Sequence, residues 1–191
     1  MLKLWGHVVE RGEKWKLMLL TGNYGRALDD KLRLALPKRL RELLVGQGQL
    51  VLTPGTDGSL ALFPQGAFAV MAEKLAARSP TGQDVRAFSR LLYAQSHSVE
   101  VDSQGRIRLP AELARLASLE GEVVLLGVGD RIEIWNKPRW EGYLKELTPR
   151  YDQLAESALS GGPVATPSQA TAATTTAVLN ETETVRPSQP R

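Results

Sequence analysis

The nine residues DDKLRLALP, at positions 29–37, occur a second time in altered form as DSQGRIRLP at positions 102–110. Both stretches place an Asp four residues before an Arg and end in a Pro after alternating apolar and polar residues. A constant offset of 73 residues pairs Asp29 with Asp102, Arg33 with Arg106 and Pro37 with Pro110. The chain therefore carries one unit twice, and this duplication sets the frame for the rest of the sequence.

The similarity extends well beyond these nine residues. Each Pro is followed by a short helical pattern, with an apolar face of Leu40, Leu43 and Leu44 in the first repeat and of Leu113, Leu116 and Ala117 in the second. Strand-like runs and one amphipathic helix then complete each repeat. The expected strands are residues 49–53, 59–63, 122–126 and 131–135, joined in pairs by the turn sequences Asp57-Gly58 and 127–130. The whole duplicated unit is thus of β-α-β-β-α type.

The segments outside the repeats divide the chain further. Residues 81–84 resemble a capping box for a helix that bridges the repeats, with an apolar stripe of Val85, Phe88, Leu91 and Leu92. From Ser160 onward there are no aromatic residues, and half of the residues are Gly, Pro, Ser or Thr, which predicts disorder. The expected divisions are an N-terminal extension (1–17), a first unit (18–79), a bridging helix (80–96), a second unit (97–150), and the end of a C-terminal helix with the tail (151–191).

Composition narrows the protein class. The 191 residues are 42% hydrophobic and 24% charged, which is typical of a globular protein, and there is no cysteine for disulfides or thiolate metal sites. No apolar run approaches the ~20 residues that span a bilayer, so we expect a cytoplasmic protein without a membrane partner. The net charge of +3 permits a nucleic-acid partner without requiring one.

The sequence offers little for catalysis. Only His7 and His97 are histidines, no Gly-X-Ser-X-Gly motif is present, and no cluster of side chains has metal-ligand spacing. We therefore expect neither an enzyme nor a cofactor, and no small-molecule substrate.

Basic residues are the more informative set. Positions 26–41 hold six basic residues against two acidic ones, and the second repeat carries Arg106 and Arg108. Arg33 and Arg106 stand out because each recurs with an Asp four residues earlier. Such a carboxylate can hold a loop closed or orient the guanidinium, and Arg is also a common reader of phosphate and guanine. Each Asp–Arg pair can be a clip that holds the loop closed, or its Arg can contact DNA. The sequence leaves both roles open, and they are compatible.

At these residues the sequence resembles a known family. The stretches LDDKLRLALPKRLRELL, VDSQGRIRLP and GVGDRIEIWNKPRWEGYL are similar to the two SpoVT/AbrB-like units of MraZ transcriptional regulators, over roughly residues 18–150. The resemblance implies a β-rich α+β fold in which two AbrB-like units of the swapped-hairpin or double-psi type pair within one chain, with flanking helices. It also implies a homo-oligomeric ring on the nucleoid that binds repeated double-stranded DNA sites and represses its own division and cell-wall gene cluster.

The resemblance assigns roles to individual residues. It ties Arg33 and Arg106 to DNA binding, and Asp29 and Asp102 to the shape of the loops that present them. The DNA-binding residues expected on this basis are Arg33, Arg106, Lys31, Arg26 and Arg108, and the structural partners are Asp29, Asp102 and Gly105.

One position departs from the family pattern. The motif favours a Gly before the Arg, as Gly105 in the second repeat, whereas the first repeat has Leu32. A β-carbon is costly at positive φ, so we expect the first loop to differ in shape from the second. The alternative to a DNA-binding regulator is therefore an oligomeric scaffold of the same fold with weakened DNA recognition. Apolar residues such as Trp135, Trp140 and Tyr143 would support self-association in either case.

Overall fold

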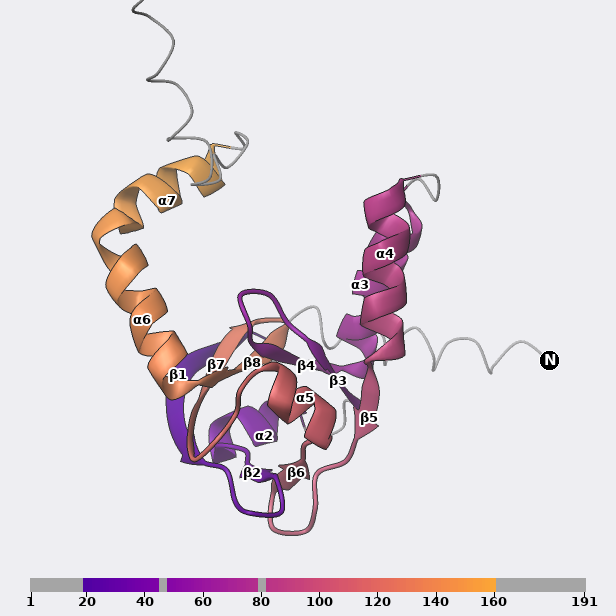
Figure 1. The fold of residues 1–191 in the computed structure, drawn as a ribbon, viewed down its shortest axis with the longest axis vertical. Coiled ribbons are helices and arrows are strands. Elements are labelled where there is room, and N and C mark those ends of the chain that lie inside the picture. The colour runs from indigo at the N-terminus through magenta and orange to yellow at the C-terminus, as the bar shows by residue number, and fades with distance from the viewer. Residues whose placement is uncertain (1–18, 45–47, 79–81, 161–191) are drawn as a thin grey trace, which may run out of the picture. The chain divides into compact units, whose positions relative to one another are not determined.

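The computed structural model describes residues 19–44, 48–78 and 82–160 of the chain (Figure 1). The chain divides into two compact units, residues 1–145 and 146–191. The predicted N-terminal extension and the tail beyond Ser160 lie outside the described residues. In the second unit, the short 3-10 helix η2 (Thr148–Arg150) leads into helix α7 (Tyr151–Leu159).

The first unit contains both repeats, and their elements follow the same order. The first repeat consists of β1 (Leu20–Ala27), β2 (Arg33–Ala35), α2 (Lys38–Leu44), β3 (Leu50–Pro54), β4 (Leu60–Pro64) and α3 (Gln65–Ala76). Helix α4 (Gln83–Ala94) follows, with Gly82 as its N-cap; Thr81 of the expected capping box lies outside the described residues. The second repeat consists of β5 (His97–Val99), β6 (Arg106–Arg108), α5 (Ala111–Leu116), β7 (Glu122–Gly129), β8 (Arg131–Asn136) and α6 (Lys137–Leu147).

The two repeats interleave in one antiparallel sheet. Its strand order is β1-β7-β8-β4-β3-β5, with the hairpins β3–β4 and β7–β8 meeting in the middle through β4 and β8. The first strand of each repeat pairs with the third strand of the other, as β1 with β7 and β5 with β3. This exchange confirms the predicted β-rich α+β fold with two paired, swapped units.

The second strands of the repeats form a separate two-stranded ribbon. In this ribbon β2 runs antiparallel to β6, with Leu34 opposite Ile107. Both of these side chains are fully buried in the main hydrophobic core. Since neighbouring residues of a strand point to opposite faces, the residues on either side of Leu34 and Ile107 face away from the core.

The short helices after each Pro cover this core with fewer residues than expected. Leu40 and Leu44 of α2 are buried, as are Leu113 and Ala117 in or after α5. However, Leu43 and Leu116, which occupy equivalent positions in the two repeats, are 37% and 53% exposed. The expected three-residue faces are therefore wrong at one position each, because helices of two turns or fewer present only a narrow side to the core.

The aromatic residues of the second repeat pack within the chain. Trp135 of β8 is buried, and the rings of Trp140 and Tyr143 on α6 lie 5.4 and 5.1 Å from its ring centroid. Trp135 is therefore not available to support self-association as expected, while Trp140 and Tyr143, which cover it, are half-buried. Exposed apolar residues are found elsewhere, for example on α4, where Phe88 is 52% and Leu91 60% exposed.

The two hairpin turns differ from each other. Asp57 and Gly58 both have positive φ, and the Ser59 amide donates to the Thr56 carbonyl, as in a type I′ turn; the predicted hairpin turn at Asp57-Gly58 is thus confirmed. In the second repeat the predicted four-residue turn is too long, because Gly127 belongs to β7. A β-carbon on Gly127 would lie 2.7 Å from the α-carbon of Thr21, so this glycine lets β1 approach closely.

None of the helices within the described residues is long and apolar enough to cross a membrane.

Candidate nucleic-acid interface

The loop between β1 and β2 is closed by Asp29. Its Oδ1 accepts hydrogen bonds from the amides of Lys31 at 2.9 Å and of Arg33 at 2.8 Å. The Leu32 amide donates to the Asp29 carbonyl at 2.9 Å, and the Asp29 amide to the Arg33 carbonyl at 3.2 Å. Leu32 has a φ of 56°. A tight turn followed by one left-handed residue is the usual way to close a three-residue hairpin loop.

The loop between β5 and β6 repeats this pattern. Asp102 Oδ1 accepts hydrogen bonds from the amides of Gln104 and Arg106, both at 2.9 Å. The Gly105 amide donates to the Asp102 carbonyl at 2.8 Å, and Gly105 has a φ of 78°. The expectation that Leu32 changes the shape of the first loop is therefore wrong. Leu32 adopts the left-handed conformation, and packing of its side chain against the main core offsets the backbone cost.

Each Asp also binds the side chain of its Arg. Arg33 Nε donates to Asp29 Oδ2 at 2.7 Å, and Arg106 Nε donates to Asp102 Oδ2 at 2.9 Å. The amides of Arg33 and Arg106, followed by the other loop donors and the guanidinium charges, hold the pKa of both carboxyl groups below its usual value. The Arg33 and Arg106 side chains remain 35% and 26% exposed. A guanidinium has five N–H donors, so each Arg keeps donors for a second partner.

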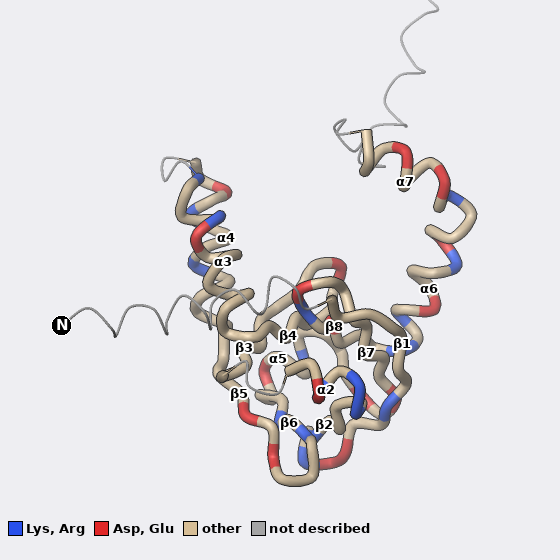
Figure 2. Tube along the Cα trace, turned by 180° about the vertical axis from the view of Figure 1, so that it is seen from behind, with Lys and Arg blue, Asp and Glu red and all other residues tan. Residues whose placement is uncertain are grey.

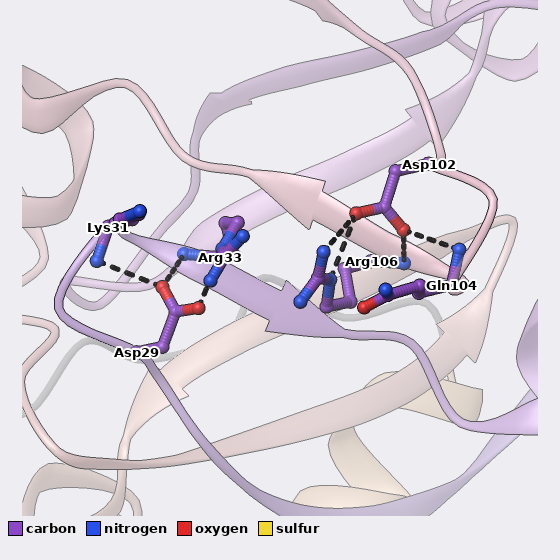
Figure 3. A network of polar contacts seen from close by, with 6 residues as sticks. All are labelled: Asp29, Lys31, Arg33, Asp102, Gln104 and Arg106. Carbon is purple, nitrogen blue, oxygen red and sulfur yellow. Dashed lines mark hydrogen bonds and ion pairs between the residues drawn. The ribbon is translucent and has the colours of Figure 1, made fainter.

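The two loops lie at opposite ends of the short ribbon, because β2 and β6 are antiparallel and each strand follows its own loop (Figure 3). Arg33 lies opposite Arg108, and Arg106 lies opposite Ala35, on the face of the ribbon that points away from Leu34 and Ile107. Lys31 sits on the first loop with an exposed side chain, and Arg108 is exposed as well. The basic residues at the ribbon and on helix α2 can be followed in Figure 2. Four of the predicted DNA-binding residues thus lie together: Lys31, Arg33, Arg106 and Arg108.

Arg26 lies apart from these four. It belongs to β1, donates to the Gly25 carbonyl at 2.7 Å, and lines a hollow with Glu122, Lys137 and Glu141. The nearby carboxylates make this a mixed-charge surface. The assignment of Arg26 to DNA binding stays a prediction that the arrangement of the ribbon does not favour.

One residue near the second loop was not singled out in the sequence. Arg41 of α2 covers Gly105, which is buried although the loop around it is exposed. The repeat alignment holds a signal for this contact. The offset of 73 matches Gly105 with Leu32 and Arg41 with Ala114, so both partners differ between the repeats.

Other chemistry is sparse in the described part of the chain. It holds no group of three or more His, Cys, Asp or Glu side chains that could bind a metal ion. His97 Nε2 lies 3.2 Å from Glu112 Oε1, an ordinary surface pair.

Comparison with known proteins agrees with the duplicated architecture. The family described as "MraZ protein, putative antitoxin-like" matches the chain twice, over residues 19–91 and 92–159. A protein of Heliobacterium modesticaldum is 43% identical over 138 residues, which is 72% of this chain and 95% of that protein. One from Saccharopolyspora erythraea is 43% identical over 143 residues (75% and 99%), and one from Moorella thermoacetica is 41% identical over 138 residues (72% and 95%). All three carry the name "Transcriptional regulator MraZ". With two matched repeats and relatives of this similarity, the chain belongs to the MraZ family.

Proposed function

We propose that this protein is a transcriptional regulator that binds double-stranded DNA through the β2–β6 ribbon and its two Asp–Arg loops. The observation that carries the proposal is the presence of Arg33 and Arg106, each oriented by its own Asp, on two loops of the same shape that flank one ribbon. The names of the relatives support the regulatory role.

The shape of the ribbon suits the proposed partner. The major groove of B-form DNA admits a two-stranded β-ribbon, and Arg is the commonest side chain to bind guanine there. The ribbon buries Leu34 and Ile107 and turns its arginines outward, so its base is rigid while its outer face is free to bind. A pre-oriented Arg loses less side-chain entropy on binding than a mobile one.

Duplication fits the proposed mode of binding. One chain presents two related loops, and a homo-oligomeric ring on the nucleoid would present many. Contacts of modest strength to repeated promoter sites then add up through effective concentration. We propose that such binding represses the division and cell-wall gene cluster to which the protein's own gene belongs.

A direct test compares Arg106→Ala and Arg33→Ala with Arg90→Ala, which removes an exposed charge on α4. Fluorescence anisotropy would use a duplex from upstream of the reading frame and a scrambled duplex. We expect each loop variant to lose about 1–3 kcal/mol of discrimination between the duplexes. Arg90→Ala should leave that discrimination unchanged. Light scattering and circular dichroism check assembly and folding.

Two results would contradict the proposal. If both loop variants discriminate between the duplexes as well as wild type does, the ribbon does not recognise DNA. A monomer mass by light scattering at micromolar concentration would remove the ring.

The second candidate is an oligomeric scaffold with weakened DNA recognition. The exposed Phe88 and Leu91 on α4 favour it, because uncovered apolar side chains on one helix suit a protein partner. Under this alternative, Phe88→Ser would disrupt assembly while the loop variants would leave DNA binding unchanged.

A further inference from the structure

The two loops have the same main-chain hydrogen bonds. They differ in what contacts the fourth residue, counted from the Asp as the first, which is Leu32 in the first loop and Gly105 in the second. In the second loop this residue is Gly105, and the side chain of Arg41 occupies the space where a β-carbon would be. Such a β-carbon would lie 2.8 Å from Arg41 Cζ and 3.1 Å from Cδ. Real β-carbons essentially never come within 3.0 Å of another group. Gly105 therefore serves two purposes, since it adopts a positive φ and admits Arg41.

This contact joins the two repeats, because Arg41 belongs to α2 of the first repeat. The same relation exists in the opposite direction. The Leu36 amide donates to the Gly105 carbonyl at 3.0 Å, and the equivalent Leu109 amide donates to the Leu32 carbonyl at 2.8 Å. Each loop is thus held by the other repeat in the same way, and the helix facing the first loop is α5, with Ala114 at the position equivalent to Arg41.

The contact between loop and helix is filled in opposite ways in the two repeats. The second loop combines a Gly on the loop with an Arg on the helix, whereas the first combines Leu32 on the loop with Ala114 on the helix. Ala114 is 4% exposed, and Leu32 packs against the core cluster that contains Ala114. A long side chain comes from the helix in one case and from the loop in the other. Only in the second loop, where the long side chain is Arg41, does this contact place a positive charge beside the loop.

Within the part of the chain that the structure describes, the charge on Arg41 has no acidic partner. Among the described residues no carboxylate forms an ion pair with its guanidinium and no acceptor takes a hydrogen bond from it, whereas Arg33 and Arg106 are each bound by an Asp. The side chain lies against Gly105, and it is half-buried. A positioned guanidinium with unused donors beside a DNA-binding loop is suited to an anion.

We propose that Arg41 is a DNA-binding residue that the first repeat supplies to the second loop, and that its partner is a backbone phosphate. The proposal rests on the proposed function. The guanidinium lies beside Gly105 at the base of the loop's last turn and, in the described part of the chain, has no carboxylate to orient it as Asp102 orients Arg106, so we assign it a phosphate and not a base. The second loop then combines Arg41 with Arg106, whereas Lys31 and Arg33 of the first loop lie near Arg108, which is opposite Arg33 in the ribbon. The two loops of one chain are unequal binding sites.

The contact itself can be tested without DNA. Gly105→Ala should lower the thermal midpoint, because it imposes a β-carbon at positive φ and displaces Arg41. In the Arg41→Ala background the same substitution should cost measurably less, since only the backbone part remains. Equal losses in the two backgrounds would show that Arg41 does not occupy the space above Gly105, and the proposal would fail.

The DNA role is tested with the full chain on specific and scrambled duplexes over a salt series. Arg41→Ala should weaken binding to both duplexes about tenfold at 0.15 M salt, and reduce the slope of log affinity against log salt by about 1. Arg41→Lys should keep the slope. Arg39→Ala, which removes an exposed charge from the same helix, is the matched control and should change affinity less. If Arg41→Ala and Arg39→Ala behave alike, Arg41 is not a specific phosphate contact.

A second, independent experiment transfers the Gly–Arg contact to the first loop. Leu32→Gly with Ala114→Arg rebuilds the second-loop arrangement at the first loop. We expect tighter binding to both duplexes and a steeper salt dependence for this double variant, and a lower thermal midpoint for Ala114→Arg alone than for the pair. A double variant that binds no better than wild type would contradict the inference. If Arg106→Ala loses discrimination between the duplexes but the Arg41 predictions fail, only this inference is refuted. If Arg106→Ala and Arg33→Ala both bind DNA like wild type, the proposed function itself is refuted.

Discussion

The first and second loops share one backbone and differ in chemistry. The two Asp residues make the same set of hydrogen bonds, and the fourth residue of each loop has positive φ although one is Leu32 and the other Gly105. Outside that frame the equivalent positions diverge. Ala35 stands where the second repeat has Arg108, and Ala114 stands where the first has Arg41.

This difference separates two kinds of constraint. The Asp and the Arg of each loop are the same in both repeats, and Leu34 and Ile107 are both large and apolar, because one shape must form twice and the halves must fit each other. Other positions differ, such as Ala35 and Arg108 on the outer face, because a duplicated unit needs only one copy of such a contact. The arrangement of positive charge is accordingly lopsided, with Arg106 and Arg108 on β6 and Arg33 alone on β2.

The largest expected effect tests whether the repeats are equal in the core. Leu34→Ala and Ile107→Ala each remove a fully buried side chain at the centre of the ribbon. We expect each to lower the free energy of unfolding by about 2–5 kcal/mol in a denaturant titration. Leu116→Ala, at a 53% exposed position, is the control and should change it by no more than about 0.5 kcal/mol.

The difference between the two core variants is as informative as the size of each loss in unfolding free energy. Similar losses would support equal roles for the repeats in holding the ribbon. A loss below about 1 kcal/mol in either variant would show that the ribbon does not depend on that repeat, since such values are typical of poorly packed sites.

A smaller effect concerns the Asp residues. Asp29→Ala and Asp102→Ala each remove the acceptor for two loop amides, so we expect faster hydrogen exchange at Lys31 and Arg33 or at Gln104 and Arg106. The change to Asn keeps one oxygen for those amides and removes the charge that holds the Arg. Asn variants should therefore keep amide protection and lose DNA discrimination. Unchanged exchange in the Ala variants would mean that the Asp residues do not close the loops.

Much of this arrangement could be predicted from the sequence, and the reasons are physical. The Asp–Arg spacing, the Pro before each short helix and the alternating strands are local signals, and all appear twice. The exchange of first strands between repeats was available only through the family resemblance, because periodicity does not report which strands pair. The cover of the Trp135 cluster by α6 was missed because an amphipathic helix does not show in its sequence whether its partner is its own chain.

The first loop shows a different limit. A Leu before the Arg argued for an altered loop, since a β-carbon disfavours positive φ. That cost is only about 1–2 kcal/mol, and burial of the Leu32 side chain is of similar size. Local propensity was therefore outweighed by packing against the other repeat, which no local pattern encodes.

The smallest expected effect is a pH dependence that both loops should share. The pKa values of Asp29 and Asp102 lie below their usual value because loop amides and the paired Arg favour the charged form. A carboxyl group with a lowered pKa in the folded state stabilises the fold above its pKa in the unfolded chain, and this contribution is lost as the pH falls through the lowered value. Both carboxyl groups are therefore charged at neutral pH, and loop order should not change between pH 6 and 8.

Below that range the two loops should titrate alike. Side-chain carboxyl resonances, followed by NMR from pH 6 to 2, should show that the pKa values of Asp29 and Asp102 lie below the usual value for an aspartate side chain. The same residues in the urea-unfolded chain serve as the reference, and Asp29→Asn and Asp102→Asn identify the two signals. A midpoint at or above the unfolded reference in one loop only would mean that this loop is not closed by its Asp in solution. The equal backbone of the two repeats, on which the whole comparison depends, would then hold for one repeat and not for the other.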